Sequence, residues 1–442
     1  MAQGALYPIL SNGPATNRIN LVLLAEGYTS VQRATFLADA TNVVNNLLAR
    51  PPFQTYRSYF NASAIFIASS QSGSDHPSQS YFRDTYFNST YDSYGINQLV
   101  TIPPNDRDAD YTHGQGRVEA LLGALAPQYD MAILVVNDLL FGGSGGGLTI
   151  TSKSSASSQI VAHESGHSFA GLGDEYGDPF PAFSGPEEYN TTRETSRGSI
   201  KWRAWISPET PIPTPPTSPY AAVVGLFEGA HYQPTNWFRP KLDCMMRTVG
   251  RPFCEVCSEA LVKAIYRRVR LVDGFIPAGS QLVAAGTQPL HFEVSLVEPA
   301  GQTLAVRWLV NQAVQEGADG VSLMLSPLAL GNGVFQVRCE ICDRTTLVRD
   351  DPEGLLRQVL DWQLEVRLPV VLKLEMPGRL PDGRVRIGAA APAPQGFILQ
   401  SSADLVTWEA LATNITKLGS FEFIEPGTNR VPRFFRGFVP GH

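Results

Sequence analysis

The residues with the clearest chemical potential lie in one short segment, His163-Glu164-Ser165-Gly166-His167. Histidines four positions apart share one face of a helix, roughly 6 Å from each other, so both imidazoles can reach one metal ion. Glu164 points into the same cleft, where it can take a proton from a water that the metal activates. The segment therefore predicts a zinc-dependent hydrolase with Glu164 as its general base, and peptide bonds are the favoured substrate.

A helix surface with two exposed histidines is the alternative explanation of this pattern. The flanking residues argue against it. Residues 157–162 are mostly small or apolar and suit the start of a helix. Gly171 and Gly173 suit its end, because glycine accepts the left-handed conformation. The chain then turns and can present Asp174 and Glu175 back toward the metal.

A catalytic zinc takes three protein ligands and keeps one position for water, so a third ligand is needed. Asp174 is the first choice, because it follows His167 past a glycine-containing turn. The metzincin pattern brings its third ligand slightly sooner after the second histidine, so this chain departs from it. Glu175 is the next candidate, and Glu187 or Glu188 would suit a carboxylate on a later helix. A turn in solvent, or a partner that orients a ligand histidine, is the alternative role for Asp174 and Glu175.

A second landmark lies downstream in Asp243-Cys244-Met245-Met246-Arg247. Metzincins place a methionine-containing turn beneath the metal, and Met245 or Met246 suits that role, although methionine is more often an ordinary core residue. A fixed donor near the metal can stabilise the oxyanion that forms when water attacks a carbonyl. The candidate donors are Arg247, Tyr176, His231 and Tyr232.

An α/β domain must position these residues. Apolar runs at 19–24, 62–68 and 131–137 predict buried strands, and residues 30–48, 116–126 and 258–269 predict helices. Thr29 or Ser30 suits the cap of the first helix. The glycine-rich residues 141–148 predict either a surface loop or an edge strand beside residues 149–151, and such an edge strand would pair with the substrate backbone.

The pattern changes after Phe275, where short runs alternate apolar and polar residues between turns. These runs lie at 291–296, 304–310, 333–339 and 362–366. We predict an α/β zincin-like catalytic domain, a mixed sheet with an active-site helix, over residues 1–273. An immunoglobulin-like β-sandwich over 274–367 and a small C-terminal β domain over 368–442 follow it.

Composition excludes several classes of partner. The 442 residues carry a net charge of −7 and no basic stripe, which argues against nucleic acid. No apolar stretch reaches the length of a membrane helix. The first residues, Met1-Ala2-Gln3-Gly4, do not form a signal peptide. The expected partner is a protein or peptide substrate.

Five cysteines complete the chemical inventory: Cys244, Cys254, Cys257, Cys339 and Cys342. Two Cys-x-x-Cys pairs suggest a structural zinc, but their wide separation across the expected domain boundary disfavours that interpretation. We expect a disulfide from Cys244 to Cys254 or Cys257. Cys339 and Cys342 could close a small loop in an exported protein.

Several stretches resemble the bacterial IgA-peptidase-type zinc metallopeptidase family over about residues 1–270. The most specific are His163 to Tyr176 and the run from Cys244-Met245-Met246-Arg247 to Cys254-x-x-Cys257. The others lie at 17–28, 52–61, 72–77, 201–205, 227–230 and 239–240. The resemblance implies one zinc and an endopeptidase that is secreted or held at the cell surface or in the periplasm, with its leader removed.

Two other functions remain open at this point. One is a cell-surface binding or adhesion protein whose zincin domain is inactive, which suits the appended β domains. An intact Glu164 argues against it, because an inactive domain has no physical need for a general base. The other is a zinc amidase that acts on peptidoglycan.

Overall fold

The computed structural model describes residues 4–103, 114–178, 184–317, 320–369, 372–391, 395–416, 419–425 and 433–439. The chain divides into two compact units. Unit 1 contains residues 1–273 and two later segments, 296–305 and 342–358, and unit 2 contains the rest. The return of those two segments to unit 1 was not predicted from the sequence. The division into three domains stays a prediction.

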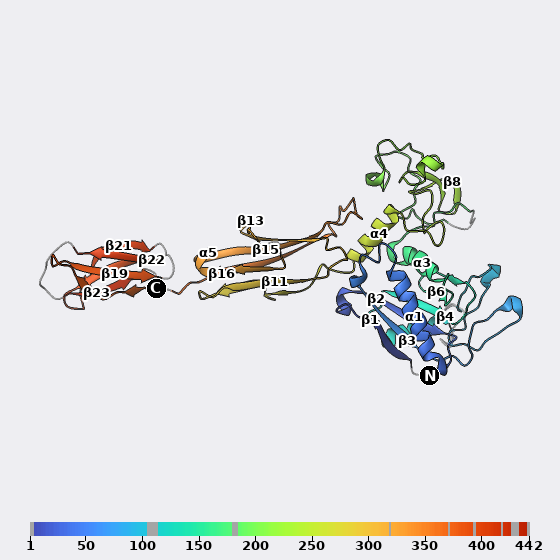
Figure 1. Ribbon diagram of the computed structural model, residues 1–442, viewed down its shortest axis with the longest axis horizontal. Coiled ribbons are helices and arrows are strands. Elements are labelled where there is room, and N and C mark those ends of the chain that lie inside the picture. The colour runs from blue at the N-terminus through green and yellow to red at the C-terminus, as the bar shows by residue number, and fades with distance from the viewer. Residues whose placement is uncertain are drawn as a thin grey trace. The chain divides into compact units, whose positions relative to one another are not determined.

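Unit 1 is built on a six-stranded mixed sheet with the order β1-β3-β2-β4-β6-β5 (Figure 1). The strands are β1 (Ala5–Leu10), β2 (Ile19–Glu26), β3 (Phe60–Phe66), β4 (Met131–Val136), β5 (Gly143–Ser144) and β6 (Thr149–Ser152). The four inner strands run parallel, and β1 and β5 are antiparallel edges. The predicted strands at 19–24, 62–68 and 131–137 are confirmed, because continuous apolar runs suit parallel strands covered on both faces.

Four long helices accompany the sheet: α1 (Arg33–Leu48), α2 (Gly114–Leu125), α3 (Ser158–Ala170) and α4 (Glu255–Tyr266). The predicted helices at 30–48, 116–126 and 258–269 are confirmed with shifted ends. A 3-10 turn over Ser30–Gln32 precedes α1. Thr29 and Gln32 form a capping box there, which satisfies backbone donors at the start of the helix.

Alternate residues of each strand face opposite sides of the sheet. Val22 and Leu24 of β2 pack in a buried cluster with Val118 and Leu122 of α2. On the other side, Phe66 of β3 packs on Phe36 of α1, and Phe60 packs on Phe169 of α3. Helix α3 is therefore held between the sheet, α1 and α4.

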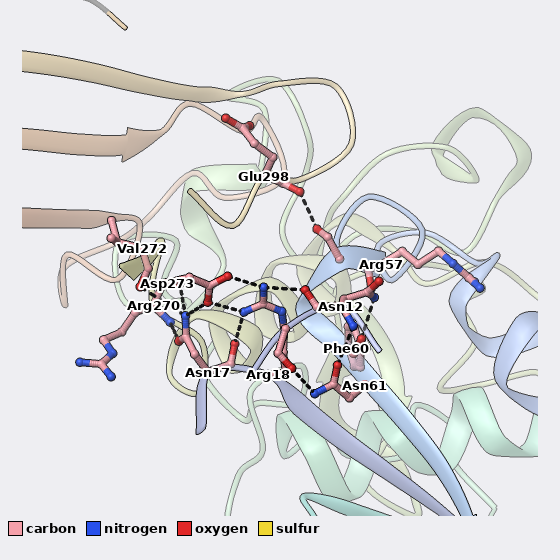
Figure 2. A network of polar contacts seen from close by, with 12 residues as sticks. Asn12, Asn17, Arg18, Arg57, Phe60, Asn61, Arg270, Val272, Asp273 and Glu298 are labelled. Atoms are coloured by element: carbon pink, nitrogen blue, oxygen red, sulfur yellow. Dashed lines mark hydrogen bonds and ion pairs between the residues drawn. The ribbon is translucent and has the colours of Figure 1, made fainter. Parts of the chain in front are cut away.

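Polar contacts tie the start of unit 1 to residue 273 (Figure 2). The Arg18 guanidinium donates to both carboxylate oxygens of Asp273, at 2.7 and 2.6 Å. Asn17 accepts a hydrogen bond from the Arg270 amide at 2.8 Å. The Ser58 hydroxyl donates to the Glu298 carbonyl, which ties in the returning segment 296–305. These contacts connect residues far apart in sequence.

Unit 2 contains several sheets. Two are built from β9 (Val272–Ile276), β10 (Gln281–Ala284), β11 (Leu290–Leu296), β12 (Leu304–Val310), β13 (Ala313–Val314), β14 (Ser322–Leu325), β15 (Gly333–Asp343) and β16 (Arg357–Val366). The rings of Phe292, Trp308 and Trp362 form their core. The C-terminal sheets contain β17 (Lys373–Leu374), β18 (Gly378–Arg379), β19 (Val385–Ala391), β20 (Gln395–Ser402), β21 (Glu409–Thr416), β22 (Gly419–Ile424) and β23 (Phe434–Phe438). Among the described residues, no helix is long and apolar enough to cross a membrane.

Candidate metal centre and catalytic site

Helix α3 presents both histidines on one face and ends where the sequence predicted. Gly171 caps it in the left-handed conformation, with φ 64° and ψ 34°. His163 and His167 lie one turn apart, and their Nε2 atoms are separated by 3.1 Å. Two imidazole nitrogens this close point at one shared position.

Asp174 completes a triangle with the two histidines. Its Oδ1 atom lies 3.3 Å from each Nε2 atom, and its side chain is only 5% exposed. Asn190 holds the turn before it through bonds to the amide and the carbonyl of Gly173, at 2.7 and 2.9 Å. The sides of the triangle match the roughly 3.3 Å expected between tetrahedral ligand atoms that lie about 2.0–2.1 Å from zinc.

The Asp174 Oδ1 atom also passes a chemical test of the site. It is buried and has no hydrogen-bond partner among the described residues. A buried carboxylate oxygen without a partner is unfavourable unless a cation compensates it. The two imidazoles and this carboxylate are therefore a donor set that fits one divalent metal ion.

The other nitrogen of each imidazole is held by the backbone. The Nδ1 atom of His163 lies 3.0 Å from the Met245 carbonyl, and that of His167 lies 2.7 Å from the Leu172 carbonyl. A carbonyl only accepts, so each Nδ1 carries the proton and donates. Both Nε2 lone pairs are then directed at the shared position, as metal-binding histidines require.

The turn at residues 243–247, called the methionine turn below, lies against α3. Met245 and Met246 are both buried. A methyl group at Gly166, between the two histidines, would come within 2.5 Å of the Met246 sulfur. The Met246 carbonyl accepts the Glu175 amide at 2.8 Å. The turn thus contacts both the helix and the segment that carries Asp174.

Glu164 has a close neighbour that sequence reasoning missed. A methyl group at Gly145 would come within 1.5 Å of the Glu164 Oε2 atom, so a larger residue here would displace the carboxylate from this position. Burial raises the pKa of Glu164, partly opposed by the charges of His163 and His167. The glycine run between β5 and β6 was the available signal, since glycine often marks a close approach.

The edge-strand prediction for the glycine-rich stretch is confirmed in part. Strand β5 pairs with β6 at the edge of the sheet. At Gly143 the outer side of β5 is already paired within the chain. Its amide donates to the Gln98 carbonyl at 3.3 Å, and its carbonyl accepts the Val100 amide at 3.2 Å. Residues 98–100 therefore occupy the edge that an extended substrate would pair with there.

Charge coupling inside the triangle is strong. Burial acts to lower the pKa of His167, but the nearby Asp174 carboxylate outweighs it and raises this pKa to about 9, so a metal ion that binds at neutral pH must displace the proton on His167 Nε2. Burial acts to raise the pKa of Asp174, but its contacts with His163 and His167 hold it well below the usual range. Asp174 is therefore ionised at neutral pH, as a metal ligand must be.

Two tyrosines lie beside Asp174. Tyr232 follows strand β7 (Phe227–Ala230) and precedes β8 (Gln233–Arg239). Its hydroxyl donates to Asp174 Oδ2. The ring of Tyr176 packs edge-on against it, with centroids 5.2 Å apart. Burial first, and then Asp174, raises the pKa of both phenols, so both stay protonated donors at neutral pH.

Other predicted site residues lie elsewhere. Glu175 turns its carboxylate toward Asn190 and Cys257. Glu187 pairs with Lys201 at 3.1 Å, and Glu188 pairs with the His231 imidazole at 2.8 Å. Arg247 is exposed and donates to the Leu242 carbonyl at 3.4 Å. The structure groups none of these side chains with the histidine pair.

The expected disulfides are corrected by the structure, because all five cysteines are free. Cys339 and Cys342 lie three residues apart on β15, and strand side chains alternate, so the two point to opposite faces. The Sγ atoms of Cys244 and Cys257 are 3.7 Å apart, well beyond the roughly 2.05 Å of a disulfide.

A mixed α/β sheet with a His-Glu-x-x-His helix and a third carboxylate is an arrangement that suits a metal-dependent hydrolase. The model of the IgA Peptidase M64 family matches residues 7–219 and 216–265, more than half of the chain. The chain belongs to this metallopeptidase family, and the resemblance seen in the sequence is confirmed.

Several solved structures resemble part of the chain. No curated protein matches the chain. The fibronectin(III)-like modules of Clostridium thermocellum CbhA match with 7% identity and a TM-score of 0.16, over 34% of this chain and 77% of theirs. A quinonprotein alcohol dehydrogenase-like protein from Bacteroides thetaiotaomicron matches with 8% identity and a TM-score of 0.17, over 34% of this chain and 42% of its own.

Proposed function

We propose that this protein is a zinc-dependent endopeptidase of extracellular proteins. The observation that supports this most directly is the triangle of His163 Nε2, His167 Nε2 and Asp174 Oδ1, with sides of 3.1, 3.3 and 3.3 Å. Two neutral imidazoles and one carboxylate are ligands that zinc prefers. Three ligands leave a fourth position for water.

A zinc ion bound by these residues would lower the pKa of water toward neutrality and polarise the scissile carbonyl. The chain supplies the proton transfers. Glu164 accepts a proton from the attacking water and donates it to the departing amine. Its half-buried carboxylate, held against Gly145, suits this exchange because desolvation raises its pKa. Tyr232 acts as a positioning residue through Asp174.

The residues that carry this chemistry all belong to unit 1. We propose that residues 274–367 form an immunoglobulin-like sandwich, which the alternating strands and the Phe292, Trp308 and Trp362 core support. The small β domain at 368–442 and the secreted or surface location stay predictions.

The test compares the wild-type protein with Glu164→Gln and Asp174→Ala. Glu164→Gln should keep the wild-type metal content and lose about 10²–10⁴-fold in kcat/KM on an unfolded protein substrate such as casein. Asp174→Ala should lose one equivalent of metal. The exposed Glu409→Gln is the matched control and should leave both values unchanged.

Three results would contradict the proposal. They are full activity in Glu164→Gln, unchanged metal content in Asp174→Ala, and a wild-type protein that binds no zinc when zinc is supplied. Cleavage of muropeptides with no cleavage of casein would move the substrate from proteins to peptidoglycan.

A further inference from the structure

A second group of metal-binding side chains lies outside the triangle. Cys244, Cys254, Cys257 and Glu175 are all buried, and their ligand atoms all lie within 4.8 Å of one another. They come from three segments: the methionine turn, the start of α4, and the residue directly after Asp174. The chain thus brings three thiols and a carboxylate to one point in its interior.

The spacing of these atoms suits metal ligands. The Sγ atoms of Cys244 and Cys257 are 3.7 Å apart, and Cys257 Sγ lies 3.2 Å from Glu175 Oε1. Thiolates bound tetrahedrally to zinc at about 2.3 Å lie roughly 3.8 Å from each other. A thiolate and a carboxylate oxygen on the same ion lie roughly 3.5 Å apart by the same geometry.

The carboxylate is not fully satisfied without a cation. Glu175 is fully buried, and its Oε2 atom has no hydrogen-bond partner among the described residues. Its Oε1 atom accepts a hydrogen bond from Asn190 at 2.9 Å. The charge of Arg239 acts on this carboxylate but leaves Oε2 without a hydrogen-bond partner, and a bound cation would satisfy that oxygen.

The start of α4 provides hydrogen bonds and an electrostatic field that stabilise thiolates. Cys254 is the N-cap of this helix, and its sulfur accepts the Cys257 amide at 3.5 Å. The Cys244 sulfur accepts the Cys254 amide at 3.2 Å. Backbone donors and the positive end of a helix dipole both stabilise thiolates, which are the form that binds metal.

We propose that Cys244, Cys254, Cys257 and Glu175 bind a second, structural Zn²⁺ ion. Binding releases the three thiol protons to solvent. Four protein ligands close the coordination sphere, so this ion has no position for water and performs no catalysis. It instead joins α4, the methionine turn and the residue beside Asp174. The inference does not depend on the proposed peptidase activity.

The experiment measures zinc content and the absorption of the cobalt-substituted protein, with cobalt as the probe. A thiolate ligand gives an intense sulfur-to-cobalt charge-transfer band, whereas the triangle of histidines and aspartate gives none. The wild-type protein should hold two ions per chain and show the band. His163→Ala/His167→Ala should hold one ion and keep the band. Cys257→Ala should hold at most one ion and should lose the band.

Cys342→Ala is the matched control, because this cysteine lies on β15 outside the cluster, and it should keep two ions and the band. If Cys257→Ala fails to fold, the wild-type protein and the double histidine variant are enough to test the proposal. A double histidine variant without the band would overturn the proposal. A wild-type protein without the band would overturn it too, whether the denatured protein then shows five free thiols or a disulfide among the three cysteines, whereas one ion with the band would instead contradict metal binding at the histidine triangle.

Discussion

The Nδ1 atom of His163 donates to the backbone carbonyl of Met245, 82 residues later, at 3.0 Å. Metal-binding histidines are often oriented by a carboxylate, which a substitution can remove. Here the acceptor belongs to the main chain, as does the Leu172 carbonyl that holds His167. The tautomer of both imidazoles therefore depends on the path of the backbone through the methionine turn and the end of α3.

Gly145→Ala should damage catalysis without removing the metal. The new methyl group would come within 1.5 Å of Glu164 Oε2 and push the carboxylate from its position. A displacement of about 1 Å in a catalytic group lowers rates on the order of 100-fold, and we expect this loss in kcat. Gly147→Ala is the control, because a methyl group there meets nothing within 4 Å. Equal kcat values for the two variants would contradict the placement of Glu164.

Gly166→Ala should destabilise the protein, although alanine normally favours a helix over glycine. The methyl group would come within 2.5 Å of the buried Met246 sulfur, and overpacking a core costs about 1–3 kcal/mol. Gly123→Ala in α2 meets nothing within 4 Å and should instead stabilise by about 0.5–1 kcal/mol. Denaturant midpoints that rise for both variants would show that Met246 does not pack on α3.

Tyr232→Phe should weaken metal binding at the triangle. It removes the hydroxyl that donates to Asp174 and fixes this carboxylate toward the histidines. Loss of such a partner typically lowers metal affinity about 10–100-fold, measurable by competition with a chelator. Tyr129→Phe is the control, because this side chain is exposed before β4. An affinity equal to that of the control would mean that Tyr232 does not position Asp174.

Asp273→Asn should destabilise unit 1 in a pH-dependent way. The hydrogen bonds from Arg18 lower the pKa of Asp273, so its contribution to stability is present above the unfolded value of about 3.9. That contribution is lost as pH falls through the lower folded pKa. The Arg18 side chain is only 3% exposed, so leaving it unpaired should cost about 3 kcal/mol at pH 7.

Unfolding free energies of wild-type protein and Asp273→Asn, measured from pH 7 down to pH 3, check this prediction. The difference between them should shrink as the pH falls. Asp382→Asn removes an exposed pair with Arg384 and should change stability by less than about 0.5 kcal/mol. A stability difference that grows as the pH falls would contradict a lowered pKa for Asp273.

The sequence by itself determined the helix with His163 and His167, its end at Gly171 and the parallel strands of the sheet. These features depend on residues within a few positions of each other. Helical spacing puts two histidines on one face, and glycine accepts the left-handed end. Apolar runs form strands wherever both of their faces become covered. Asp174 could be predicted by the same reasoning, because it follows His167 by only seven positions.

The tertiary structure alone decided which distant residues meet. Gly145 makes room for Glu164, Met246 packs on Gly166, and Tyr232 holds Asp174. It also turned Glu175 away from the histidines toward Cys257, 82 residues later, where sequence spacing had suggested a disulfide. Such contacts depend on the path of the whole chain, because a residue's local preferences do not specify which surfaces folding brings against it.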